Sequence, residues 1–271
     1  MNWKLSGLAL ASAVVLAGCG SDGDESSTPA SIYVRVAHLS PNAPSVDFCV
    51  KEGSGSFTGP VLESIGVASG LPYTGVTRYL TLPAGQYTVR LVAPAATDCS
   101  ASLAGLPDYT LPALAGGTYA TAAAVGLVGG TPSFTVKPFV DEYTVATGKG
   151  SVRFIHASPG TPAVDVGVGA GASFTAVFTN VAFPDIGVGM GIDGNGYFTT
   201  DPLTNVTLSA RVHGTSTDAL VVPGANLAAG TTATVFAIGI AGDATTPLRA
   251  LVCGDNVAPT GNLSTCSVVG S

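Results

Sequence analysis

The sequence predicts an all-β protein with two tandem antiparallel β-sandwich domains that follow a secretory signal and a short tether. Three observations predict this class. The 271 residues include 36 Gly and 18 Pro, and only 10% of them are charged. Short apolar runs alternate with turn residues at intervals of roughly 8–12 positions, whereas outside the signal no amphipathic helical pattern extends over three turns. Finally, two segments of the sequence each occur twice.

Residues 1–18 are expected to form a signal peptide. A short start with Lys4 precedes the apolar run 5–17, which is shorter than the roughly 20 residues of a membrane-spanning helix. The run ends in Leu-Ala-Gly-Cys19, which resembles the bacterial lipobox, in which the cysteine is acylated (palmitate is a typical chain) and becomes the first residue. A plain signal peptide with a chance cysteine is the alternative.

Residues 19–30 are expected to form a flexible tether, because they are acidic, rich in Ser and without apolar periodicity. By the lipobox resemblance, an aspartate after the lipidated Cys19 would mark retention in the inner membrane, but Gly20 and Ser21 stand there. We therefore expect a lipid-anchored protein of the bacterial cell envelope, most simply at the outer membrane, with the face of the membrane left open.

The remaining four cysteines predict two disulfides, since an even number of cysteines in an oxidising compartment favours pairing. Three pairings are possible. We favour Cys49 with Cys99 and Cys253 with Cys266, because each pair then lies within one half of the chain. The cysteines form no CxxC motif and lie near no histidine cluster, so we expect no metal and no cofactor. The formal net charge of −7 argues against a nucleic-acid partner.

Individual strands can be assigned from alternation. Residues 31–38, SIYVRVAH, place Ile32, Val34, Val36 and His38 on one face, as expected for an antiparallel sheet packed on a single side. Residues 78–92 contain two strands joined by a Pro-Ala-Gly turn.

The duplication defines the domains. RVAHLSPNAPSVDFCV from Arg35 and RFIHASPGTPAVDVGV from Arg153 share eight of sixteen residues, and the segments 114–127 and 227–240 share eight of fourteen. The chain is therefore predicted to contain two copies of a module of about 110 residues, a common domain size. We expect a first repeat at 31–146, a second at 150–258 and a C-terminal tail at 259–271, with each repeat able to fold separately.

The motif H-x-SP-x-x-P-x-VD, followed by YLTLPAGQYTVRL and LPALAGGTYAT, resembles the bacterial family called domain of unknown function 4397. The resemblance covers nearly all of residues 31–258 and is strong in the first copy. In the second copy, residues 201–214 must supply the strand that LPAGQYTV supplies in the first. The resemblance implies tandem β-sandwiches, here taken as immunoglobulin- or transthyretin-like, in secreted proteins and lipoproteins, and it implies no catalytic residues.

The repeated motif favours an architectural role. A symmetric hairpin centred on Pro41 would place Arg35 opposite Asp47, and likewise Arg153 opposite Asp165, as cross-strand ion pairs that fix the register. His38 and His156 would lie at the strand ends and hydrogen-bond the backbone of the Ser-Pro turn. A His/Asp metal site or acid–base pair is the functional alternative, but it lacks further local ligands.

We therefore expect no enzymatic activity, and a hydrolase is the least favoured class. The leading hypothesis is a module for protein interaction or a structural role. The alternative is a protein that binds a polysaccharide or small ligand through the first module, since Tyr side chains suit stacking on sugars. That module holds seven of the eight tyrosines, at positions 33, 73, 79, 87, 109, 119 and 143.

Overall fold

The computed structural model describes residues 30–270. The expected signal peptide at 1–18, the lipidation of Cys19 and almost all of the expected tether at 19–30 lie outside the described residues. Between residues 30 and 270 the chain forms sixteen strands and one α-helix of a single turn, and no helix in this range is both long and apolar enough to cross a membrane.

The first half of the chain contains two sheets, with the strand orders β3-β1-β6-β7 and β2-β4-β5. The short helix α1, Val61–Ser64, packs beside β2 at the edge of the second sheet and contributes the fully buried Leu62. The strands are β1 (Ser31–His38), β2 (Asp47–Glu52), β3 (Leu80–Pro83), β4 (Tyr87–Val92), β5 (Tyr109–Thr110), β6 (Tyr119–Val125) and β7 (Thr135–Asp141), with a 3-10 turn at Leu103–Gly105.

The second half repeats this arrangement, with the orders β11-β8-β14-β15-β16 and β10-β9-β12-β13. Its strands are β8 (Gly150–His156), β9 (Val164–Val168), β10 (Thr175–Val181), β11 (Tyr197–Thr200), β12 (Leu203–Val212), β13 (Asp218–Leu227), β14 (Thr232–Ile238), β15 (Arg249–Gly254) and β16 (Cys266–Val269), with a 3-10 turn at Gly171–Ser173. β12 pairs with β9 as β4 pairs with β2, so residues 201–214 do supply the expected strand.

The predicted all-β architecture of two sandwiches is confirmed, with one departure from antiparallel pairing in each half. β1 is parallel to β6, and β8 is parallel to β14. Parallel strands are usually buried on both faces, and these are: Val36 contributes to the core of the first sandwich, while Ala37 packs on the other side of the sheet. The expectation of one polar face was therefore wrong for β1.

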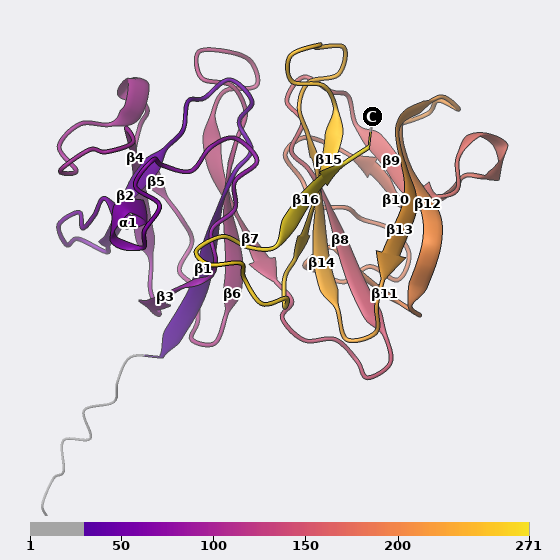
Figure 1. Ribbon diagram of the computed structural model, residues 1–271, viewed down its shortest axis with the longest axis horizontal. Helices are drawn as coiled ribbons and strands as arrows, with labels where there is room; N and C mark the ends of the chain where they lie inside the picture. The colour runs from indigo at the N-terminus through magenta and orange to yellow at the C-terminus, as the bar shows by residue number, and fades with distance from the viewer. Residues whose placement is uncertain (1–29, 271) are drawn as a thin grey trace, which may run out of the picture.

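The outer face of each inner sheet is covered by the other half of the chain. Figure 1 shows four layers side by side, with β1, β6 and β7 next to β8, β14 and β15 in the middle. One apolar cluster joins the two halves, and its buried members are Ala37, Leu39, Val76, Ala123, Val125 and Phe139 from the first half and Ile155, Ala157, Phe236, Ile238, Leu251 and Cys253 from the second. The halves therefore share a core in addition to their own.

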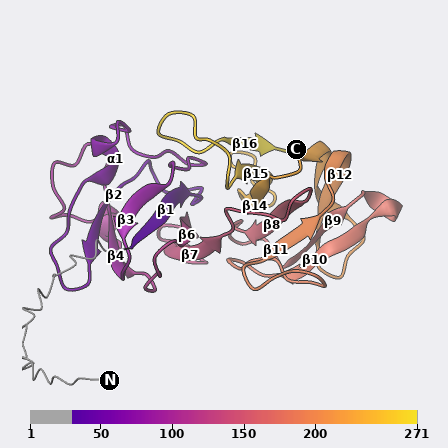
Figure 2. The same ribbon diagram turned by 90° about the horizontal axis from the view of Figure 1, so that it is seen from below.

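The expected C-terminal tail is part of this assembly. Its strand β16 pairs with β15, and the loop before β16 reaches the first half, as Figure 2 shows. There Ser264 N–H donates to Val76 O at 2.9 Å, and Arg78 N–H donates to Asn262 O at 2.9 Å. Both favoured disulfides are present, Cys49–Cys99 and Cys253–Cys266, and the second holds the base of this loop.

Candidate functional site

The predicted ion pair between Arg35 and Asp47 does not exist, nor does its counterpart between Arg153 and Asp165. β1 and β2 belong to different sheets of the sandwich, as do β8 and β9. The Ser-Pro turn therefore carries the chain from one sheet to the other instead of closing a hairpin. Arg35 points to the second half of the chain, while Asp47 remains within the first sandwich.

Asp47 binds backbone N–H groups in place of an arginine. Its carboxylate accepts hydrogen bonds from the N–H groups of Phe48 at 2.6 Å, Leu62 at 2.9 Å and Glu63 at 3.3 Å. The last two belong to the first turn of α1, whose N–H groups have no partner inside the helix. Asp47, which is 1% exposed, therefore fixes α1 against β2.

Asp165 has a different environment because the second repeat has no counterpart of α1. Its carboxylate accepts from Asn180 N–H at 2.7 Å and lies 2.8 Å from Nδ1 of His213. Partial burial would raise the pKa of Asp165, but the hydrogen bonds from Asn180 and His213 outweigh it, and this pKa is lower than usual. The two motif aspartates thus share a position but not a set of partners.

His38 and His156 make the expected contact with the turn. His38 Nε2 lies 2.9 Å from Pro44 O, and His156 Nε2 lies 3.1 Å from Pro162 O. Burial lowers the pKa of both imidazoles, although their backbone hydrogen bonds oppose the shift. Among residues 30–270, no three His, Cys, Asp or Glu side chains gather in a way that could hold a metal ion.

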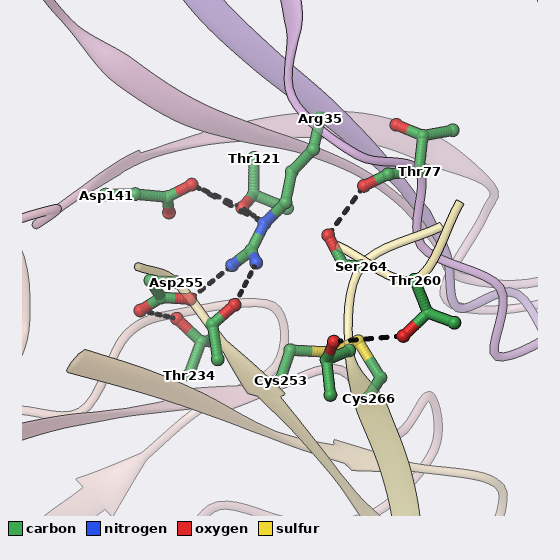
Figure 3. The surroundings of a disulfide bond; sticks show 12 residues. Arg35, Thr77, Thr121, Asp141, Thr234, Cys253, Asp255, Thr260, Ser264 and Cys266 are labelled. Carbon is green, nitrogen blue, oxygen red and sulfur yellow. Dashed lines mark hydrogen bonds and ion pairs between the residues drawn. A yellow bond between two sulfur atoms is a disulfide. The ribbon is translucent and has the colours of Figure 1, made fainter. Parts of the chain in front are cut away.

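The motif arginine of the first repeat binds across the interface. Arg35 Nη2 donates to Asp255 Oδ1, Arg35 Nη1 donates to Gly254 O at 3.1 Å, and Arg35 Nε donates to Thr121 Oγ1 at 2.8 Å. Figure 3 shows the guanidinium between Thr121 and Asp141 of its own half and Asp255 of the other. Both side chains of the Arg35–Asp255 pair are 0% exposed.

The motif arginine of the second repeat makes the reciprocal contact. Arg153 Nη2 donates to Asp141 Oδ1 and to Thr234 Oγ1 at 2.9 Å, and Arg153 Nη1 donates to Val140 O at 2.6 Å. β7 and β15 occupy equivalent places in the two repeats, and Asp141 ends β7 while Asp255 directly follows β15. The duplication therefore relates the two ion pairs to each other.

A tyrosine completes each half of this network. Tyr79 OH donates to Asp141 Oδ2 at 2.8 Å, and Tyr197 OH donates to Asp255 Oδ2 at 2.6 Å. The rings also lie beneath the guanidinium groups, with Arg35 Cζ 5.0 Å from the Tyr79 centroid and Arg153 Cζ 4.7 Å from that of Tyr197. We call these eight residues the interface network: Arg35, Tyr79, Thr121 and Asp141 with Arg153, Tyr197, Thr234 and Asp255.

The charges of the interface network stabilise one another. Burial alone would raise the pKa of Asp141, but Arg153 and Arg35 hold it below its usual value. Burial alone would likewise lower the pKa of Arg35, but Asp255 and Asp141 raise it above its usual value. The two arginines therefore lie against two aspartates across the interface, where the opposite charges offset the cost of burial and join the two inner sheets.

Of the interface network, sequence reasoning singled out the two arginines and, as one of the seven tyrosines of the first module, Tyr79. A signal for the rest was present, because Thr121 and Thr234 occupy the same position of the second duplicated segment. The two tyrosines also correspond in position, because Tyr197 pairs with Arg153 between β11 and β8, and Tyr79 directly precedes β3, which pairs with β1. What the alignment could not reveal is that each arginine binds the aspartate of the other copy.

Tyrosines of the first half gather beside the interface network. Tyr119 stacks between Tyr33, at 4.4 Å between ring centroids, and Tyr143, at 4.1 Å. Tyr79 meets Tyr119 edge to face at 5.1 Å. Tyr143 is 39% exposed, whereas the other three are half-buried. We call these four residues the tyrosine cluster; it joins the buried network to the surface at the junction of the repeats.

Comparison with solved structures gives distant matches. The carbohydrate-binding module of family 26 from Eubacterium rectale Amy13K, solved with maltoheptaose, is 12% identical, with 85% of this chain and 99% of that chain covered and a TM-score of 0.22. A candidate cell adhesion protein from Bacteroides fragilis is 10% identical, with 85% and 99% covered and a TM-score of 0.22. One from Bacteroides eggerthii is 13% identical, with 89% and 96% covered and a TM-score of 0.18. Matches this distant carry no argument about function.

The sequence itself gives a firmer assignment. No curated protein matches the chain, but the family model named "Domain of unknown function (DUF4397)" matches residues 32–167. The match spans the first repeat and the motif of the second, from Arg153 to Asp165, and is shorter than the expected 31–258. The chain therefore belongs to the DUF4397 family.

Proposed function

We propose that the protein is a non-enzymatic, lipid-anchored component of the bacterial cell envelope that binds a partner protein through the tyrosine cluster. The observation that carries this proposal is the stack of Tyr33, Tyr119 and Tyr143 at the junction of the repeats. Tyrosines that combine a large apolar ring with a polar hydroxyl are enriched at protein interfaces. The shared core of the two halves supplies a rigid base for such a surface.

The rigidity of the cluster favours recognition. Each ring is held by a neighbouring ring, and Tyr79 is fixed further by its hydrogen bond to Asp141. Side chains ordered before binding lose less conformational entropy when a partner binds. Because Tyr119 has a ring stacked on each side, the cluster offers edges and hydroxyls more than open faces, which suits a protein contact better than sugar stacking.

A glycan partner is the alternative hypothesis. The tyrosine cluster belongs to the Tyr-rich first module, and Tyr side chains suit stacking on sugars. The two hypotheses differ in the partner that is retained. The full mature chain, used as bait for an envelope extract and on a glycan array, should retain a protein and not a glycan. Tyr143→Ala and Tyr33→Ala should each weaken that binding by roughly tenfold or more, the loss typical of an interface hot spot.

Val268→Ala is the control for these variants, because Val268 is 43% exposed and lies on β16, away from the cluster. It should leave binding unchanged. Retention of defined glycans with the same dependence on Tyr143 would replace the protein partner by a glycan. Binding that is insensitive to both tyrosine substitutions would refute the proposed surface.

The proposed location rests on the lipobox resemblance of residues 16–19. Lipidation of Cys19 with two or three acyl chains would give stable anchoring. In membrane fractionation, the variant Cys19→Ala should no longer sediment with the membranes, while its ectodomain stays folded. A variant that remains in the pellet would show that another part of the protein holds it there.

A further inference from the structure

The interiors of the two sandwiches differ in how completely they are filled. In the first sandwich the space left between the sheets is about 50 Å³. In the second, a cavity of about 730 Å³ lies between the sheets and reaches the surface. Protein interiors rarely contain voids much larger than a water molecule, whereas ligand sites commonly measure roughly 300–1,000 Å³. The duplication makes the first sandwich an internal reference for the second.

Specific residues account for the difference. In the first sandwich Phe48 on β2 faces Leu91 on β4, and both are buried in its core. At the same positions of the second sandwich Val166 on β9 faces Ala210 on β12. Each replacement removes side-chain volume from the space between the sheets. The second repeat also lacks a counterpart of α1, whose Leu62 completes the first core.

The walls of the cavity are aliphatic and aromatic. Val152, Phe154, Val235 and Leu208 are among the lining residues, and all but Phe154 are only half-buried, as residues facing an open interior should be. Arg153 is the one residue with an ionisable side chain in the lining, and its guanidinium is engaged on the opposite face of β8 with Asp141 and Val140 O. The cavity therefore presents no charge to a ligand.

Three polar side chains of the lining lie at its rim, whereas the buried Ser209 hydroxyl is already bonded to Gly169 O at 2.7 Å. Asn226 at the end of β13, Thr265 before β16 and Ser267 within β16 are exposed and border the cavity. They can hydrogen-bond the uncharged polar end of a molecule whose remainder is buried. An apolar interior with a neutral polar rim fits a hydrocarbon chain with a polar end, because only such a molecule leaves no unpaired polar group inside.

We propose that the second sandwich binds the acyl chain of a lipid between its two sheets, with the polar end of the lipid at the rim between β13 and β16. This site is independent of the tyrosine cluster. The first sandwich, filled by Phe48, Leu91 and Leu62, does not bind such a ligand.

The test fills the cavity with the residues of the first repeat. The full mature chain should bind the uncharged fluorescent probe N-phenyl-1-naphthylamine at one site. The double variant Val166→Phe/Ala210→Leu should bind it at least roughly tenfold more weakly while unfolding at the same or a higher denaturant concentration. The gain in stability separates a filled site from a damaged protein.

Val268→Phe is the matched control. It adds the same aromatic side chain to β16, but on the exposed face opposite Val269, which lines the cavity. The control should bind the probe as the unmodified chain does. Native mass spectrometry of the purified protein should show a bound lipid that the double variant lacks, and its mass distinguishes a free fatty acid from a phospholipid.

Equal probe binding by the double variant would place the probe elsewhere and overturn the proposal. Absence of both probe binding and a copurified lipid from the unmodified chain would overturn it as well. Neither outcome would affect the tyrosine cluster, because partner binding there is measured with Tyr143→Ala.

Discussion

Arg35 of the first repeat and Asp255 of the second form a buried ion pair across a sequence separation of 220 residues. Arg153 and Asp141 form the reciprocal pair. A charge that leaves water loses hydration energy that only a well-placed partner offsets. The two repeats therefore depend on each other, because each contains the partners that the charges of the other require.

Removal of one charge should expose this dependence. Arg35→Met leaves Asp255 buried without its cation, and the free energy of unfolding should fall by about 3–5 kcal/mol, the usual effect of breaking a buried pair. Lys149→Met is the control, because the Lys149–Asp201 pair is 44% and 82% exposed and such pairs contribute about 0–1 kcal/mol. Denaturant unfolding measures both, and equal effects would contradict the account.

The two motif aspartates should differ in the cost of the same substitution. Asp47→Asn places an amide donor among three backbone N–H donors, and we expect a loss of about 1–3 kcal/mol. Asp165→Asn should cost less, because the side chain of Asp165 is 17% exposed and its partners lie near the surface. Chemical denaturation of the two variants side by side checks the order. A larger loss for Asp165→Asn would contradict the role of Asp47 in fixing α1 against β2.

Glu142 predicts a dependence of stability on pH. Its partial burial and its contact with Asp193 raise its pKa to about 7, from 4.5. Between these two pKa values the folded protein binds more protons than the unfolded chain. The stability that this carboxyl contributes is therefore present below pH 4.5 and is lost as the pH rises through about 7.

Glu142→Gln should therefore stabilise the protein above pH 7 and have little effect near pH 4.5. The buried imidazoles His38 and His156 act in the opposite direction, because their lowered pKa values make protonation destabilising as the pH falls below 6.5. The difference between the unmodified chain and the variant isolates Glu142. An equal difference at both pH values would exclude the expected titration.

The disulfide Cys253–Cys266 should stabilise the contact between the C-terminal loop and the first half. It closes a loop over a sequence separation of 13, for which a loss of roughly 3 kcal/mol is expected on removal. The double variant Cys253→Ala/Cys266→Ala should also increase hydrogen exchange at Arg78, whose N–H is bonded to Asn262 O. Unchanged exchange at Arg78 would mean that the loop holds its position without the disulfide.

Local signals predicted the local structure. Alternation and turn residues located β1, and the separation of the cysteines in the sequence favoured the two disulfides that form. The parallel pairing of β1 with β6 was missed, because a strand buried on both faces can still alternate between large and small side chains, as Val36 and Ala37 do. A short sequence pattern does not reveal which distant strand pairs with β1 or in which register.

The candidate sites were harder to predict because they depend on relations between the repeats. Arg35 was singled out, but its partner lies in the other copy, and a repeat alignment alone cannot distinguish contacts within a copy from contacts between copies. The cavity was visible only as the change from Phe48 to Val166 and from Leu91 to Ala210, and its meaning required knowledge of which residues face each other. The length of each repeat suggested independent folding, but length says nothing about a shared core.

The separate expression of residues 27–148 and 149–271 tests the central claim that the repeats form one folding unit. In each fragment alone, the arginine and the aspartate of the interface network lose their ion-pair partners in the other half, and half of the shared apolar cluster loses its cover. We predict that each fragment alone lacks a cooperative unfolding transition by circular dichroism, and that the two fragments expressed together form a folded one-to-one complex. If either fragment instead folds as a stable monomer with its own cooperative transition, the claim is wrong.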